Sequence, residues 1–302
     1  GAMANKGNLT IGRSWMQESA MSPKENNMSG SLFYGAGSFV TAWHPSGIVG
    51  DFRPQGYDYG YTRYGTGDTS GIDRIDFSND DVEASPKGYL SRAGRYQIGL
   101  SNSSYGYASG GQSTTNPETS FVDRIDYNND NVVSLERGNL ATAVYDHGAV
   151  SNNDYGYTFG GTSFGNPSIS VIQRIDFGND TATASPKSNL TSASSNTKST
   201  GNSNYGWIGA VPQETTHVER IEYSNDTVTP LSRGKFTTKL SRHSATGNVD
   251  YGWYGGGDPS TGYGTLITRL DYANDTASAT PRGSLNNGGY DKGATGNRDY
   301  GY

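Results

Sequence analysis

Five pairs of opposite charge recur along the chain, each an arginine followed two residues later by an acid. Residues two apart in a β-strand point to the same face, so each pair could form an ion pair or hold a charged ligand. Because the pair returns in every repeat, we interpret it as a structural ladder within or between repeats and not as five active sites. The pairs are Arg74 and Asp76, Arg124 and Asp126, Arg174 and Asp176, Arg220 and Glu222, and Arg269 and Asp271.

Other residue types that carry chemistry are scattered. The chain has no Cys, which excludes thiol catalysis and thiolate metal sites. No nucleophile elbow, phosphate-binding loop or dinucleotide motif is present. The four histidines stand at unrelated positions without ligand spacing, so we expect no metal, no cofactor and no catalytic residue. They are His44, His147, His217 and His243.

Loop carboxylates leave one enzymatic alternative open, a glycan-cleaving activity. Glycosidases place two carboxyl groups on either side of the bond that they break. Glu118, Glu214 and Asp258 come one to a repeat, with no evident pairing. We therefore predict that the protein is not an enzyme.

Composition predicts an all-β protein. Of 302 residues, 43 are Gly and 22 are Tyr, and only 32% are apolar, which suits short strands and tight turns better than long helices. No apolar run approaches the roughly 18 residues of a spanning helix, so we expect no membrane insertion. The net charge of −6 gives no general attraction to nucleic acid.

Two short motifs return along almost the whole chain. From each repeated arginine to the next Tyr-Gly motif the distance is always 31 residues, whereas from that motif to the following arginine it varies from 15 to 19. All length variation therefore falls in one loop of each repeat, and the period is 46 to 50 residues. The motif Tyr-Gly-Tyr or Tyr-Gly-Trp begins at Tyr59, Tyr105, Tyr155, Tyr205, Tyr251 and Tyr300.

Each period divides into four expected strands, here called segments A to D. Segment A has small residues and ends at a Gly-Asn turn, and segment B is the Tyr-Gly motif running into Gly-Gly. Segment C contains the arginine, as in Val122 to Tyr127, and is followed by an Asn-Asp turn. Segment D is typified by Thr181 to Ala184 and is closed by Ser185-Pro186-Lys187. Four strands in this length match one blade of a β-propeller.

The order of these segments resembles the kelch repeat, in which a Tyr-rich strand ends in Gly-Gly and a later strand ends in Asp-aromatic. The Trp that marks the kelch D strand is absent from the five regular repeats. The uniform Tyr-Gly-Tyr and Asn-Asp-Thr motifs resemble the kelch-like repeats of tail or structural proteins from marine bacteriophages. The resemblance implies a galactose-oxidase-like propeller, but a chain without Cys cannot form the cysteine-linked cofactor of galactose oxidase.

The ends of the chain predict the number of blades. Six A–B pairs are present but only five C–D pairs follow them, so the last C and D strands are expected from residues 32–35 and 40–47. We therefore predict a six-bladed propeller closed by N-terminal outer strands pairing with C-terminal inner strands, with five or seven blades as alternatives. Residues 1–3 are interpreted as an expression scar, residues 4–30 as a separate segment, and residues 31–302 as a single propeller domain.

An up-and-down blade has two ends. The A–B and C–D turns lie at one end, here the turn face of the disc, and the B–C and D–A loops lie at the other, the loop face. We expect basic residues at the D–A corners to form a ring on the loop face, favouring an anionic ligand. These are Lys87, Arg137, Lys187, Arg233 and Arg282. The turn face is expected to carry Asp80, Asp130, Asp180, Asp226 and Asp275.

Loops that vary on a constant scaffold usually carry binding specificity. Aromatic rings and amides in the variable B–C loops are therefore the expected ligand contacts. The candidates are Asn116, Phe164, Asn166, His217 and Tyr263.

These observations predict a non-enzymatic binding module, a phage tail or virion-associated adhesin that recognises a host-surface glycan or protein. Its expected location is the virion, where it acts extracellularly, and a cytoplasmic location is the alternative. A structural virion protein that mediates protein–protein assembly is the second function left open. Nucleic acid is not an expected partner, and the oligomeric state is open.

Overall fold

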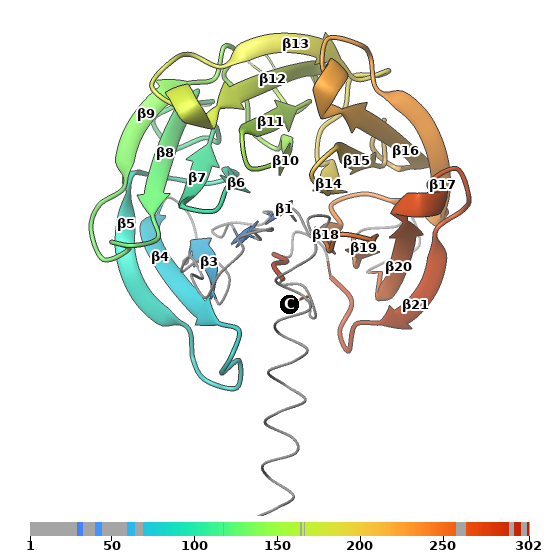
Figure 1. Cartoon of the computed structure of the whole chain (residues 1–302), viewed down its shortest axis with the longest axis horizontal. Helices are drawn as coiled ribbons and strands as arrows, with labels where there is room; N and C mark the ends of the chain where they lie inside the picture. Colours follow the sequence, from blue (N-terminus) through green and yellow to red (C-terminus); the bar gives the residue numbers. More distant parts are fainter. Residues whose placement is uncertain are drawn as a thin grey trace, which may run out of the picture.

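The computed structural model describes residues 29–32, 40–43, 59–63, 69–116, 118–163, 165, 167–257, 264–289, 293–296 and 301. These residues form antiparallel four-stranded blades that follow one another around a common centre (Figure 1). The prediction of an all-β propeller is confirmed. Within the described residues, no helix is long and apolar enough to cross a membrane.

Five blades are present among the described residues, so the prediction of six is wrong. The first blade contains β2 (Val40–Trp43), β3 (Tyr59–Arg63), β4 (Thr69–Asp76) and β5 (Ser85–Gly94). The second contains β6 (Ile98–Ser101), β7 (Tyr105–Ser109), β8 (Phe121–Asp126) and β9 (Leu135–Asn139). The third contains β10 (Gly148–Ser151), β11 (Tyr155–Phe159), β12 (Val171–Asp176) and β13 (Ser185–Asn189). The fourth contains β14 (Lys198–Gly201), β15 (Tyr205–Gly209), β16 (Thr215–Glu222) and β17 (Leu231–Leu240), and the fifth β18 (Ser244–Gly247), β19 (Tyr251–Gly255), β20 (Leu266–Asp271) and β21 (Thr280–Ser284).

The N-terminal strands explain the error in blade number. Val40 pairs with Thr62, which makes β2 the innermost strand of the first blade and not the outer strand of a sixth. The strand β1 (Ser29–Leu32) pairs with β2 on one side and with β14 on the other, at the centre of the propeller. Innermost strands are only four residues long, so residues 40–43 could be matched to the wrong segment by composition alone.

The outer strand of each blade starts later than the sequence suggested. The third blade's outer strand runs from Ser185 to Asn189, with Pro186 opposite Gln173 on β12. Proline lacks an N–H group, which an edge strand tolerates because only one side of it is paired. The Ser-Pro-basic motif therefore opens the outer strand beside the turn face, whereas we had expected it to close that strand at the D–A corner.

Each residue of the Tyr-Gly-Tyr motif makes a different contact, as the second blade shows. The first ring, Tyr105, lies under the Arg124 guanidinium at 4.2 Å. A Cβ atom on Gly106 would come within 3.0 Å of the Tyr127 hydroxyl, so glycine makes room for the aromatic residue that follows β8. The last ring, Tyr107, is fully buried and stacks on Phe177 of the next blade at 4.5 Å. The motif thus joins neighbouring blades.

Equivalent stacks connect the other described neighbours. Buried aromatic pairs of this kind contribute about 0.5–1.5 kcal/mol beyond the burial of their area. The centroid distances are 5.1 Å for Tyr61 on Tyr127, 5.0 Å for Tyr157 on Tyr223 and 3.8 Å for Trp207 on Tyr272.

Candidate ligand-binding site

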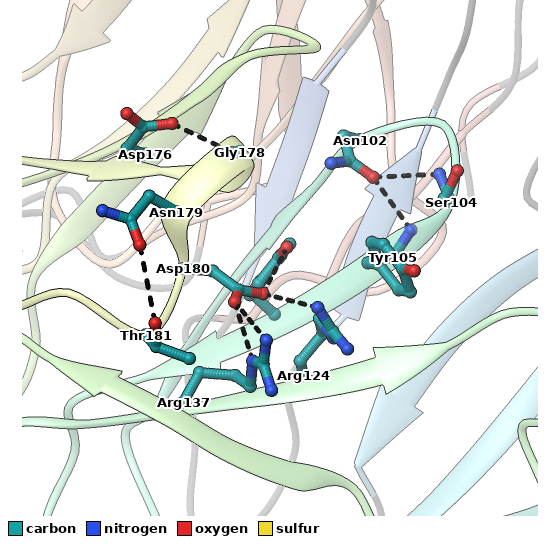
Figure 2. Close-up of polar contacts among 11 residues, drawn as sticks. Asn102, Ser104, Tyr105, Arg124, Arg137, Asp176, Gly178, Asn179, Asp180 and Thr181 are labelled. Atoms are coloured by element: carbon teal, nitrogen blue, oxygen red, sulfur yellow. Dashed lines mark hydrogen bonds and ion pairs between the residues drawn. The ribbon is translucent and has the colours of Figure 1, made fainter.

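Buried aspartates close the joints between blades on the turn face. Asp180 follows β12 and accepts bonds from Arg124 Nη1 at 2.8 Å, Arg137 Nε at 2.7 Å and the Tyr107 hydroxyl at 3.1 Å (Figure 2). Its side chain is only 4% exposed. Burial tends to raise the pKa of Asp180, but the bonds and charges of Arg137 and Arg124 outweigh burial and hold this pKa below its usual range. The carboxylate is therefore ionised and structural.

The same arrangement recurs at three further joints. Asp130 receives Arg74 at 2.8 Å and Lys87 at 3.6 Å, and Asp226 receives Arg174 at 2.7 Å. Asp275 receives Arg220 at 2.8 Å and Arg233 at 3.5 Å. The arginine of segment C thus reaches the aspartate of the next blade.

The acids of the predicted pairs have a separate role at the turns. Asp126 accepts the backbone N–H of Asn128, and Asp76 accepts both the N–H and the hydroxyl of Ser78. Asp176 and Asp271 cap the following turns through Gly178 and Ala273, and Glu222 accepts the Ser224 hydroxyl. Arg269 stacks on Tyr251 at 4.0 Å.

The predicted basic ring on the loop face is wrong. Lys87, Arg137 and Arg233 each lie within ion-pair distance of an aspartate on the turn face, so the two expected rings of opposite charge coincide. The reason is the later start of the outer strands, which places these residues beside the Asn-Asp turns. Lys187 is half-buried and Arg282 is exposed at the equivalent positions.

A cavity of about 190 Å³ opens on the loop face between the first and second blades. It lies between the end of β5 with its following linker and the B–C loop of the second blade. Its volume corresponds to about six water molecules, enough for one sugar ring or one side chain of a larger ligand. Among its lining residues are Arg92, Gln97, Gln112, Thr115, Asn116 and Phe121.

Two glycines and a short backbone bridge hold the loop in place. Gly110 and Gly111 have φ of +60° and +97°, a region that side chains other than glycine rarely adopt. A Cβ atom on Gly111 would also come within 2.6 Å of the Arg95 oxygen. Arg95 and Gln112 exchange both backbone hydrogen bonds at 2.8 Å, which joins the linker to the loop.

The cavity combines an arginine held by its neighbours with two amide side chains. The Arg92 guanidinium lies 3.7 Å from the Phe121 ring centre and donates to Glu136 at 2.8 Å, which compensates its charge. Gln97 is 8% exposed, and its buried Oε1 has no hydrogen-bond partner among the described residues. The Asn116 side chain is exposed at the rim. Such mixed donors and acceptors match the hydroxyl groups of a neutral polar ligand.

Of the predicted ligand contacts, Asn116 lines this cavity. His217 lies on β16 in the fourth blade, where its carbonyl accepts the Ala210 N–H at 2.8 Å, and the structure does not bring it to the cavity. Phe164, Asn166 and Tyr263 lie outside the described residues. Sequence reasoning missed Arg92 and Gln97. Gln97 could have been found by aligning the repeats, because His147, Thr197 and His243 occupy its position in other blades.

The remaining candidates form no reactive cluster among the residues described. His147 and His243 are buried in separate blades, where burial and then the Lys198 charge lower the pKa of each to about 3. No three metal-ligating side chains gather within the described part of the chain. Glu118 and Glu214 belong to the loops of the second and fourth blades. His44 and Asp258 lie outside the described residues.

A scan of known protein families finds no match, and no curated protein matches the sequence. The fold does have solved counterparts. The chain superposes on the structure of YjhT with a TM-score of 0.64 and 9% sequence identity, covering 87% of this chain and 88% of that one. This likeness shows the fold alone.

Proposed function

We propose that the protein is a non-enzymatic binding module that takes one unit of a host-surface glycan into the loop-face cavity. The observation that carries this proposal is the cavity itself, whose wall combines the amide side chains of Gln97 and Asn116 with the Arg92 guanidinium and the Phe121 ring. Amide groups exchange hydrogen bonds with ligand hydroxyl groups, and an aromatic ring packs against the apolar face of a sugar.

The cavity favours a neutral glycan over an anionic one. Arg92 is already compensated by Glu136, and the basic residues first expected to attract anions pair with aspartates on the turn face. The kelch-like repeats and their resemblance to marine phage tail proteins support a role as a tail adhesin acting outside the cell. A structural role in virion assembly is the competing function, and the same experiment separates the two.

The test is saturable binding of the labelled protein to marine bacterial cells and to their extracted polysaccharides. We expect Asn116→Ala and Gln97→Leu to weaken binding about tenfold each, the loss expected for a hydrogen bond with a free energy of 1–1.5 kcal/mol. Asn131→Ala is the matched control, because this exposed amide lies on the turn face of the same blade. Binding that survives both loop-face substitutions, or no binding to any surface, would contradict the proposal and favour assembly.

A further inference from the structure

Each described joint between blades works as a socket that receives the outer hairpin of the next blade. The socket consists of an aromatic ring from the second strand, a cation from the third, a cation from the fourth and a small residue beside it. The fourth blade supplies Trp207, Arg220, Arg233 and Gly234, and the incoming hairpin supplies Tyr272 and Asp275.

The fourth socket binds its hairpin at every point. The Trp207 ring stacks on Tyr272 at 3.8 Å and 3°, and its Nε1 donates to Asp275 Oδ2 at 2.8 Å. The Gly234 N–H donates to the Asp275 backbone oxygen at 2.6 Å. A Cβ atom on Gly234 would come within 2.0 Å of the Ala277 oxygen, so only glycine permits this approach.

The fifth blade repeats these four residue types at the same positions, with the socket unfilled in the described structure. The counterparts are Trp253, Arg269, Arg282 and Gly283.

Trp253 and Arg269 are half-buried, and Arg282 and Gly283 are exposed, whereas the residues of the fourth socket are buried or paired. Trp253 is half-buried, while Trp207 is 1% exposed. Arg282 is exposed, and no ion pair of Arg269 or Arg282 occurs among the described residues. A Cβ atom on Gly283 would meet no atom of the described residues within 4 Å. In Figure 1 the strand β21 lies at the end of the arc of blades, where no further described blade follows it.

We propose that this flank of the fifth blade is a docking surface for a β-hairpin of a protein partner, with an aromatic residue three positions before an aspartate at its turn. The spacing is that of Tyr272 and Asp275, which fill the equivalent socket. The occupant's ring stacks on Trp253, its carboxylate bonds with Arg269 and Arg282, and its turn carbonyl lies against Gly283.

Chemistry selects a hairpin over a small anion. An anion could neutralise the two arginines, but it would not cover the Trp253 ring. It would also not explain why a glycine occupies the position that lies against a turn carbonyl in the fourth socket. A hairpin satisfies all four groups together and adds main-chain pairing along an open strand edge, a common mode of peptide recognition. This inference does not depend on the glycan cavity, which lies on the loop face of other blades.

The probe is a synthetic peptide of residues 266–284, the hairpin that the fourth socket binds. Leu266 and Ser284 are paired opposite each other, so L266C and S284C close the hairpin by one disulfide. Binding of the fluorescently labelled cyclic peptide to the intact protein is measured by polarisation. We expect saturable binding that weakens about tenfold or more when the peptide carries D275N, since a hydrogen-bonded charge is lost.

Gly283→Val in the protein is the decisive variant. Its Cβ atom meets no atom of the described residues within 4 Å but would collide with the occupant's turn, so we expect peptide binding to disappear while the melting temperature stays unchanged. Thr280→Val is the matched control on the same strand, because its counterpart Leu231 stays 50% exposed beside an occupied socket.

Two results would overturn the proposal. One is the absence of peptide binding up to about 1 mM, a free energy of roughly −4 kcal/mol. The other is binding that Gly283→Val leaves intact. A third result would also contradict the proposal, namely self-association of the protein that both Gly283→Val and Asp80→Asn abolish. In that case the occupant of the socket would be the first blade of a second copy and not a hairpin of another protein.

Discussion

The turn face and the loop face of this propeller treat buried polar groups in opposite ways. On the turn face, Asp180 is satisfied by two arginines and a tyrosine, and the same arrangement recurs at the other described joints. On the loop face, Gln97 keeps an unpaired acceptor at a cavity wall. On the turn face the same stabilising contacts therefore recur at each described joint. On the loop face the residues differ between joints, and this difference leaves space for a ligand.

The loop face itself contains both closed and open joints. Before the fourth blade, Gln213 accepts from Ser195 and Asn196 and donates to Ser241 at 2.8 Å, which fills the space between linker and loop. Before the second blade, the equivalent space is the cavity. The difference comes from a few loop residues on the same scaffold, so recognition can change while the blades stay constant.

The largest expected effect comes from breaking the turn-face network. Asp180→Asn removes a charge that two arginines surround, and we expect the free energy of unfolding to fall by about 3 kcal/mol, as for other buried pairs that lose one partner. Asp80→Asn is the matched control, because Asp80 occupies the same repeat position but is exposed. Chemical denaturation of both variants measures the difference, and equal losses would show that the joints do not stabilise the fold.

A second prediction concerns the close backbone approach at each joint. Gly234→Ala places a methyl group 2.0 Å from the Ala277 oxygen, so we expect a loss of about 2 kcal/mol from overpacking. Gly283→Ala has open space around it, and its effect on unfolding should stay within about 0.5 kcal/mol. Thermal unfolding of the two single variants provides the comparison. A similar loss in both would mean that backbone freedom, not contact, requires glycine here.

The buried histidines predict a loss of stability in mild acid. Because the pKa values of His147 and His243 fall to about 3 in the folded state, protonation near pH 6.5 favours the unfolded chain. The stability that depends on these neutral histidines is present in full well above pH 6.5 and is lost progressively as the pH falls toward 3. Between pH 7 and 5.5 we expect a loss of about 1 kcal/mol per histidine. Chemical denaturation across this pH range measures the slope, and His243→Gln should remove one such step.

Much of the scaffold could be predicted from the sequence because each repeat contact depends on residue type at a fixed spacing. Tyr105, Gly106 and Tyr107 recur since every joint needs a cation site, a space and a stacking ring. The partners of the arginines could not be found by spacing alone, because Arg124 bonds with an aspartate 56 residues away. The basic ring was misplaced for another reason, because spacing did not show that the outer strands start later than expected.

The cavity was harder to predict because it forms where one joint lacks the side chains that fill the equivalent space at another joint. Asn116 was found as an amide in a variable loop, but Gln97 lies at a linker position where the other blades have different residues. Only a position-by-position alignment of the repeats shows such a departure. The blade number failed for a related reason, since residues 40–43 lack the motifs that identify segments B and C.

The smallest expected effect on stability belongs to Gln97, a residue that we expect to contribute to glycan binding. Gln97→Leu keeps a side chain of similar size and removes the unpaired oxygen, so unfolding should change by less than about 0.5 kcal/mol or become harder. Glycan binding should nevertheless weaken, because the polar amide of this cavity-lining residue is gone. Denaturation and binding measured on one preparation test both parts. A clear loss of stability would show that Gln97 stabilises the fold. The buried polar groups of the loop face would then be structural, as those of the turn face are.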